Sequence, residues 1–291
     1  MNDAKISLIL STKDRADQLK LCLDHIAQIH SRIPWELIVI DNGSTDHTAG
    51  VLEIFAASVS FSVIRLYEAR RGRSYGLNEA LRISNGEIVA FVDDDCYVTP
   101  DHIDQVAKVF TDQKIGFAGG RVELFDPTDY PMTIATSTEM KLFPPFSVIP
   151  GGEMLGANMM FRRSVINEVG GFDVDFGPGT PLVADDTDVL IRASFSGWWG
   201  VYTPDAVVAH HHGRKAKDAV ALARKYCNGS GALNLKFVLM RKTRLHFLKA
   251  CYWYFLGIAR RKYPIKTLFW EIEGAARYCA KRARRYLLPA T

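Results

Sequence analysis

In the first 125 residues, two patterns of hydrophobic positions alternate along the chain. Short uninterrupted apolar runs are typical of strands buried on both faces, and they predict strands at 5–11, 35–40, 61–67, 87–92 and 115–119. Between these runs apolar residues recur every three or four positions, which predicts helices at 15–29, 74–83 and about 101–110. A further helix is expected after 44–46 and through Phe55. Strands that alternate with helices at this spacing predict an α/β fold with a mainly parallel sheet flanked by helices.

The second half of the chain has a less regular pattern. Residues 125–155 are rich in Pro, Thr and Ser and show little periodicity, which predicts a long active-site loop. Strands are expected at 156–161, 198–202 and 206–209, and helices at 163–169 and 184–195. Beyond Gly213 the pattern predicts helices in which aromatic and basic residues interleave.

The net charge of +4 hides a strong asymmetry between two parts of the chain. Residues 1–212 hold 17 Lys and Arg against 29 Asp and Glu, a net charge of −12. Residues 213–291 hold 19 Lys and Arg against 3 Asp and Glu, a net charge of +16. We therefore expect two regions, 1–212 and 213–291, that meet different partners.

Cysteine spacing and hydrophobic run length exclude several classes of protein. The five cysteines are scattered without a Cys-x-x-Cys pair, which argues against a zinc site or a disulfide framework and fits a reducing compartment. Residues 1–20 carry charges of both signs and do not resemble a signal peptide. No run of about 20 apolar residues is present, so no membrane-spanning helix is expected.

Three consecutive carboxylates, Asp93, Asp94 and Asp95, follow the apolar run at 87–92. Carboxylates this close repel one another, and a divalent cation would offset that repulsion. Carboxylate oxygens are the ligands that Mg²⁺ and Mn²⁺ prefer, and open α/β sheets bind ligands at the carboxyl ends of their strands. The triplet therefore suggests a metal site; the alternative is a solvated acidic turn.

Two further groups of charged residues and a histidine run suggest functional sites. Arg70, Arg71 and Arg73 can clamp a diphosphate through bidentate hydrogen bonds, or form a solvated charged surface, and Arg73 is the preferred member. Asp185, Asp186 and Asp188 fall in the first turn of a predicted helix, where the helix dipole favours anions. In the run 210–212, the first and third histidines lie on one face of a strand.

Six segments in this order resemble family 2 glycosyltransferases with the GT-A fold. They are Ser7–Arg15, Val39–Asp46, Asp93–Asp95, Gly170–Asp173, Ala184–Asp188 and Val207–His212, and together they span about residues 5–213. The acidic triplet looks like the family's DxD motif. The chain departs from the family at Lys13-Asp14, where Tyr-Asn is usual, and at Ala184-Asp185-Asp186, where Gly-Glu-Asp is usual. The Gln-x-x-Arg-Trp motif of processive members is missing, which implies transfer of single sugars.

The resemblance implies a role for each candidate residue. Asp41 would accept a hydrogen bond from the nucleotide base, typically uracil, although an Asp before Asn-Gly can also simply form a turn. Ser11 and Arg15 would border the same pocket, and Arg73 would bind the diphosphate. Asp93 and Asp94 would lie on the ribose and nucleotide side.

For the reaction itself, the resemblance implies a metal ion and a general base. Asp95 would bind Mn²⁺ or Mg²⁺, and His210 or His212 would complete the metal shell. Asp186 would deprotonate the acceptor hydroxyl, with Asp185 as the second candidate. The alternative for these helix-terminal acids is stabilisation of the helix dipole.

The expected activity is therefore inverting, metal-dependent transfer of one sugar from a nucleoside-diphosphate sugar, with a UDP-sugar preferred. The acceptor would be a glycan or a lipid-linked molecule in cell-surface polysaccharide or glycoconjugate synthesis. One alternative is a sugar nucleotidyltransferase, but the loop after the first strand, 11–15, lacks the usual glycines. Another is a non-catalytic nucleotide-binding protein whose basic tail contacts nucleic acid, which would leave the acidic clusters unexplained, so no nucleic-acid partner is expected.

The basic tail predicts a different kind of partner. The apolar segment 245–258 is too short to span a bilayer, and basic runs at 260–262 and 281–285 flank it. Helices of this kind suit an anionic membrane surface, which predicts a cytoplasmic enzyme held peripherally on the inner face of the membrane. The alternative is a helical cap on the first region.

Overall fold

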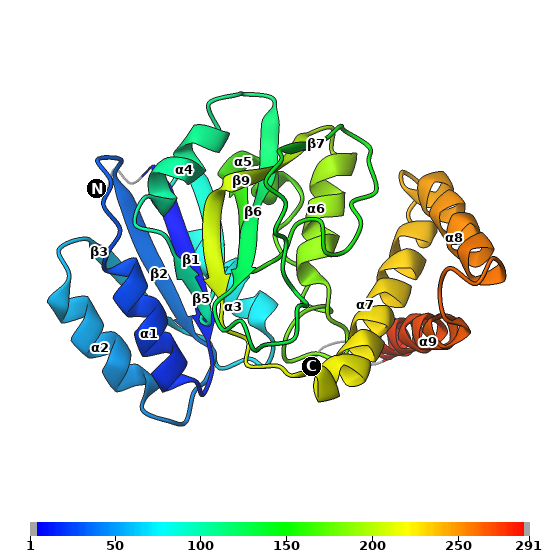
Figure 1. The fold of residues 1–291 in the computed structure, drawn as a ribbon, viewed down its shortest axis with the longest axis horizontal. Helices are drawn as coiled ribbons and strands as arrows, with labels where there is room; N and C mark the ends of the chain where they lie inside the picture. The colour runs from blue at the N-terminus through cyan, green and yellow to red at the C-terminus, as the bar shows by residue number, and fades with distance from the viewer. Residues whose placement is uncertain (1–4, 288–291) are drawn as a thin grey trace.

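The computed structural model describes residues 5–287, with side chains through residue 283, and within them nine strands form one sheet. Helices cover both faces of the sheet, and three long helices extend from one side of it (Figure 1). The strand order is β3-β2-β1-β4-β8-β6-β9-β5, and β7 pairs with β9. The α/β architecture predicted from the sequence is confirmed.

The first half of the sheet is parallel, as the alternating pattern predicts. Its strands β3, β2, β1 and β4 lie side by side, with a helix in each connection. The elements are β1 (Ile6–Thr12), α1 (Ala16–Ile26), β2 (Trp35–Asp41), α2 (Thr48–Ser58), β3 (Ser62–Tyr67), α3 (Arg73–Ile83) and β4 (Ile88–Asp93). The carboxyl ends of these strands therefore meet at one edge of the sheet.

The second half mixes parallel and antiparallel strands. β8 lies antiparallel between β4 and β6, β9 is parallel to β6, and β5 and β7 are antiparallel to β9. The elements are β5 (Cys96–Val98), α4 (His102–Val109), β6 (Ile115–Leu124), β7 (Lys141–Phe143), β8 (Asn158–Arg162), α5 (Arg163–Glu168), α6 (Asp185–Phe195) and β9 (Trp199–His210).

Two sequence-based expectations for this half need correction. The strands expected at 198–202 and 206–209 are one strand, β9, because its pairing with β6 resumes after a register shift at Gly120 and Arg121. Pro204 lies in the part of β9 that does not pair with β6, so its lack of a backbone N–H leaves no hydrogen bond to β6 unmade. The loop expected at 125–155 contains β7 and a bridge between Val122 and Ala135.

The hydrophobic core lies on both faces of the sheet, because neighbouring residues of a buried strand point in opposite directions. In β1, Leu8 and Leu10 join the cluster under α1, α2 and α4, while Ile9 joins the cluster under α3 and α6. All three are fully buried. This two-sided burial explains the uninterrupted apolar runs in the sequence.

The chain after β9 forms the short helix η1 (Ala216–Asp218) and the long helices α7 (Ala219–Leu239), α8 (Arg244–Ala259) and α9 (Ile265–Leu287). Leu233 and Phe237 of α7 join the core cluster on the α6 side of the sheet. α7 and α9 cross closely at glycines, since a Cβ on Gly231 would lie 1.9 Å from the carbonyl oxygen of Glu271. None of the helices in the described part of the chain is long and apolar enough to cross a membrane.

Candidate active site

The acidic triplet lies at the carboxyl edge of the parallel strands. Asp93 ends β4, and Asp94 and Asp95 form the turn before β5. The Arg15 guanidinium donates to both of the latter, with 2.7 Å from Nη1 to Asp94 Oδ1 and 2.8 Å from Nη2 to Asp95 Oδ2. Thr12, at the end of β1, also donates to Asp94, at 2.7 Å. Arg15, expected at the border of a nucleotide pocket, thus binds the triplet directly.

Burial and charge act differently on the two inner carboxylates. Burial raises the pKa of Asp94 to about 6, although the nearby Arg15 opposes this shift. For Asp95, burial also raises the pKa, but the contacts with His210 and Arg15 outweigh it and hold the pKa below its ordinary value. Asp95 is therefore the more firmly ionised of the two.

Arg73 connects the triplet to the second acidic cluster. It begins α3, its side chain is 15% exposed, and it forms ion pairs with Asp93 and with Asp185, the latter at 3.1 Å. Arg70 instead pairs with Glu68 and Glu79. Arg71 donates to the Gly179 carbonyl. Among the three arginines, Arg73 is the one whose contacts within the described residues connect the triplet to the second acidic cluster.

The second acidic cluster begins α6. Asp186 accepts hydrogen bonds from the Gly156 amide at 2.9 Å and the Thr187 amide at 2.6 Å. Burial and the adjacent Asp185 raise the pKa of Asp186 above its ordinary value. Ala184, just before the cluster, has a φ of 98°, a conformation that favours the glycine usual at this position in the resembled family.

Asp188 has a structural environment distinct from its neighbours. Its side chain is fully buried and forms ion pairs with Arg192 and with Lys236 of α7. Lys236 also pairs with Asp173, at 2.8 Å. Asp188 therefore ties α6 to α7 rather than facing the triplet.

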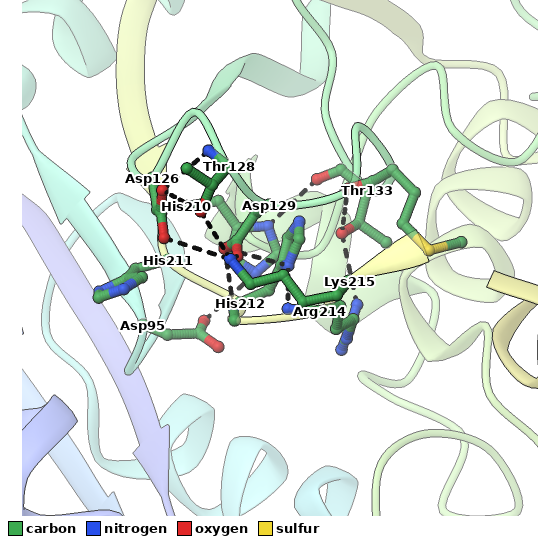
Figure 2. A network of polar contacts seen from close by, with 12 residues as sticks. Asp95, Asp126, Thr128, Asp129, Thr133, His210, His211, His212, Arg214 and Lys215 are labelled. Atoms are coloured by element: carbon green, nitrogen blue, oxygen red, sulfur yellow. Dashed lines mark hydrogen bonds and ion pairs between the residues drawn. The ribbon is translucent and has the colours of Figure 1, made fainter. Parts of the chain in front are cut away.

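The histidine run ends β9 beside the triplet, and Figure 2 shows its contacts. His210 Nε2 lies 3.4 Å from Asp95 Oδ1, and its Nδ1 lies 3.1 Å from the Thr133 carbonyl. Because a carbonyl only accepts, Nδ1 carries a proton and Nε2 faces Asp95. His212 lies next to it, with ring centres 5.0 Å apart, whereas His211 contacts Tyr97 on the other side of the strand.

The start of the 125–155 loop packs over these histidines (Figure 2). Asp129 is buried there and accepts hydrogen bonds from Lys215 Nζ at 2.7 Å and from the Gly213 amide at 2.9 Å. His212 Nδ1 lies 3.5 Å from the same carboxylate. Sequence reasoning missed Asp129, Thr133 and Lys215, because neither hydrophobic periodicity nor spacing marks these residues.

The residues around Asp95 fit a divalent cation. Within the described part of the chain, one group of three metal-capable side chains has ligand atoms within 4.8 Å of one another, namely Asp95, Cys96 and His210. Burial raises the pKa of the Cys96 thiol well above its ordinary value, so it stays protonated and is a poor ligand. A carboxylate oxygen and an imidazole nitrogen remain, which suits Mn²⁺. His212 is not part of this group.

The candidate base-binding residues lie at the same edge, at the ends of β1 and β2. Ser11 pairs in register with Asp93 and donates to Asn42 at 2.9 Å. Asp41 accepts a hydrogen bond from the Ser44 amide at 2.7 Å, so it forms the turn that its sequence context also predicts. The same edge of the sheet thus carries Ser11, Asp41 and the triplet.

Comparison with known proteins places this arrangement in context. A family model described as glycosyl transferase family 2 matches residues 7–170. The chain is 22% identical over 206 residues to glycosyltransferase AglE of Haloferax volcanii, covering 70% of this chain and 66% of that protein. It is 28% identical over 171 residues to a beta-monoglucosyldiacylglycerol synthase of Nostoc, covering 56% of this chain and 35% of that protein. The matches thus span between about a third and two thirds of these relatives.

Two solved structures show the same fold. One is the mannosyltransferase PcManGT from Pyrobaculum calidifontis in complex with GDP-Man and Mn²⁺, with a TM-score of 0.64 and 20% identity. That match covers 99% of this chain and 88% of the other. The other is S. aureus TarS 1–349 in complex with UDP-GlcNAc, with a TM-score of 0.60, 16% identity and coverage of 84% and 69%.

Proposed function

The chain belongs to glycosyltransferase family 2, and from that premise we propose that it transfers a single sugar, with inversion, from a nucleoside-diphosphate sugar to a glycan or lipid-linked acceptor. The observation that carries this proposal is the double ion pair of Arg73. One largely buried guanidinium contacts both Asp93 of the triplet and Asp185, the neighbour of the candidate base. A donor at the triplet would therefore lie beside a carboxylate that can act on the acceptor.

On the donor side, Asp95 and His210 would hold Mn²⁺ or Mg²⁺, with His212 as the alternative histidine. A divalent cation bound there would neutralise charge on the departing nucleoside diphosphate. The guanidinium groups of Arg73 and Arg15 both lie against the acidic triplet, where they can donate to phosphate oxygens. Ser11, Asp41, Asp93 and Asp94 would bind the nucleoside, and a UDP-sugar remains the preferred donor.

On the acceptor side, Asp186 is a better candidate base than Asp185. Asp185 is engaged by Arg73 at 3.1 Å, so its carboxylate is already occupied by a guanidinium. Asp186 has a raised pKa, closer to that of an efficient general base at neutral pH. Amide hydrogen bonds from Gly156 and Thr187 fix its orientation.

The C-terminal helices support peripheral binding to an anionic membrane surface on the cytoplasmic side. Large apolar side chains of α8 and α9 are exposed, namely Leu245, Leu248, Tyr252, Trp253, Phe255, Ile265, Phe269 and Ile272. They lie in the region with 19 Lys and Arg and 3 Asp and Glu. Interfacial helices combine these two features, and a membrane site would bring a lipid-linked acceptor to the enzyme.

The direct experiment is incubation of the full-length protein with a panel of UDP- and GDP-sugars, Mn²⁺ and a membrane lipid extract as acceptor source. Release of the free nucleoside diphosphate is measured, with EDTA and the Asp186→Asn variant as controls. We expect release with one class of donor, dependent on the cation and on Asp186. Absence of release with every donor, or release unaffected by EDTA, would contradict the proposal.

A further inference from the structure

A small basic cavity lies where α7 and α9 meet the loop that precedes α6. Its volume is about 300 Å³, at the lower end of the range for small-ligand sites. Its lining consists of Pro181, Ala221, Arg224, Lys225, Asn228 and Arg277. None of these residues takes part in the donor or metal contacts described above.

The cavity gathers more positive than negative charge. Arg224 and Arg277 both bind the carboxylate of Glu273, with Nη2 to Oε distances of 2.9 Å and 2.7 Å. Lys225 forms no ion pair with any described residue. Three cations thus line the cavity, and one carboxylate, Glu273, pairs with two of them. The excess of positive charge favours an additional anion.

The cationic groups are held by rigid elements. The α7 residues that line the cavity, at positions 221, 224, 225 and 228, share one helix face because their spacing follows the helical repeat. Glu273 of α9 fixes Arg224 of the facing helix α7 through both carboxylate oxygens, and it also pairs with Arg277, one turn further along α9. Arginine groups oriented in advance can bind a phosphate through paired hydrogen bonds.

The cavity lies against the segment that leads to the candidate base. α7 touches the segment that leads into α6, since a Cβ on Gly229 would lie 2.4 Å from the Val183 carbonyl oxygen. Pro181 lies five residues before Asp186, so their Cα atoms are at most about 18 Å apart.

We propose that this cavity binds a phosphate or diphosphate group carried by the acceptor, and so positions the acceptor hydroxyl near Asp186. The proposal rests on the proposed transfer function, and it names a part of the acceptor that the donor site does not recognise. The phosphate can be free or attached to a lipid, because the three cations recognise the same group in both cases. Arg224, Lys225 and Arg277 would bind this phosphate.

The test is calorimetric titration of the full-length protein with inorganic diphosphate, geranyl diphosphate and geraniol. EDTA is present, so that diphosphate cannot enter the donor site through a cation. The test variant is Lys225→Glu, because this side chain has no ion pair to lose within the described residues. The matched control is Lys242→Glu, an exposed position after α7 with the same change of charge.

We expect Lys225→Glu to weaken diphosphate binding roughly tenfold or more, as loss of a hydrogen bond to a charged group does, while Lys242→Glu leaves it nearly unchanged. Stronger binding of geranyl diphosphate than of inorganic diphosphate would identify a lipid-carried phosphate, and equal binding would identify the phosphate alone. Three results would overturn the proposal: no binding by the unmodified protein, equal weakening by both variants, or equal binding of geraniol. Because nucleotide sugar and metal are absent, these results are independent of the transfer assay.

Discussion

The sheet region and the C-terminal helices use hydrophobic residues in opposite ways. In the sheet region, apolar residues of β1, β2 and β4 are almost completely buried against helices of the same chain. In α8, a helix of 16 residues that is described throughout, Phe247 is the single buried residue, and Leu245 is 77% exposed. Apolar residues thus build a core in one region and remain largely exposed in the other. The difference predicts separate tasks, catalysis in the first region and attachment in the second.

The two regions are nevertheless joined by buried contacts. Lys236 of α7 pairs with Asp188, two residues after the candidate base, and packs over the ring of Phe176. The same ring meets Tyr278 of α9, with ring centres 5.7 Å apart. Removal of the chain after Gly213 would leave Asp188 and Phe176 exposed, so the tasks of the two regions are best separated by point substitutions in the full chain.

The largest expected effect comes from the candidate base in the sheet region. Asp186→Asn keeps the shape of the side chain and one of its two amide hydrogen bonds but removes its ability to take a proton. We expect nucleotide binding to persist and the transfer rate to fall by roughly 10²-fold or more, the usual scale for a lost general base. Single-turnover kinetics measures this loss. Retained turnover in Asp186→Asn with loss in Asp185→Asn would move the role to Asp185, and retained turnover in both would remove it from this cluster.

The next effect concerns the contact between the regions. Lys236→Met removes a cation whose side chain is 10% exposed and leaves Asp173 and Asp188 with fewer partners. Breaking a buried ion pair from one side is strongly destabilising, and because Arg192 still neutralises Asp188 we expect a loss of about 3 kcal/mol in the free energy of unfolding. Denaturant titration measures it, with the exposed Lys242→Met as control. Equal stability of both variants would show that α7 does not support α6.

Acid should affect the sheet region through His102 in α4. This side chain is completely buried, and burial lowers its pKa to about 4. The unfolded chain then binds more protons between about pH 6.5 and pH 4, so stability falls as the pH decreases through that window, by roughly 3 kcal/mol at pH 4. His102→Phe should reduce this slope of the free energy of unfolding against pH. Identical slopes in the two proteins would contradict the assigned cause.

Attachment by the C-terminal helices should show a smaller effect. Trp253→Ser combined with Phe255→Ser removes two side chains that are 55% and 51% exposed. Flotation with anionic liposomes at low salt should show about tenfold weaker binding for this variant, because less apolar surface is buried in the membrane. Ile54→Ser, at an exposed apolar position of α2, should bind normally. If the unmodified protein does not float with strongly anionic liposomes, the helices serve as a cap or a protein-docking surface.

The same contrast explains what could be predicted from the sequence. The strands β1, β2 and β4 could be predicted because burial on both faces leaves a continuous apolar run, and the acidic triplet follows directly from the end of such a run. The strands β5 and β7 could not be predicted, because three residues are too few to show an alternating hydrophobic pattern. β9 was divided in two because Pro204 and Asp205 are typical of turns, whereas its pairing with β6 continues beyond them.

The site could be predicted as a set of motifs but not as a set of contacts. Ser11, Arg15, Asp41 and the triplet lie in or just after the ends of neighbouring parallel strands, so their proximity is a consequence of parallel pairing. The contacts of Arg73 with Asp185, of Lys236 with Asp188 and of Lys215 with Asp129 join distant segments. Such contacts depend on how helices and loops pack, which local sequence patterns do not encode.

The central claim is that Asp95 binds a cation that is required for donor binding. The most direct measurement is calorimetric titration of UDP and of GDP, with and without Mn²⁺, into the unmodified protein and into Asp95→Ala. The exposed Asp205→Ala serves as control. We expect one nucleotide to bind tightly in the presence of Mn²⁺, and we expect this binding to be lost without the ion or in Asp95→Ala but kept in Asp205→Ala. Equal affinity with and without Mn²⁺ and in all three proteins would contradict the assignment of Asp95 as the metal ligand.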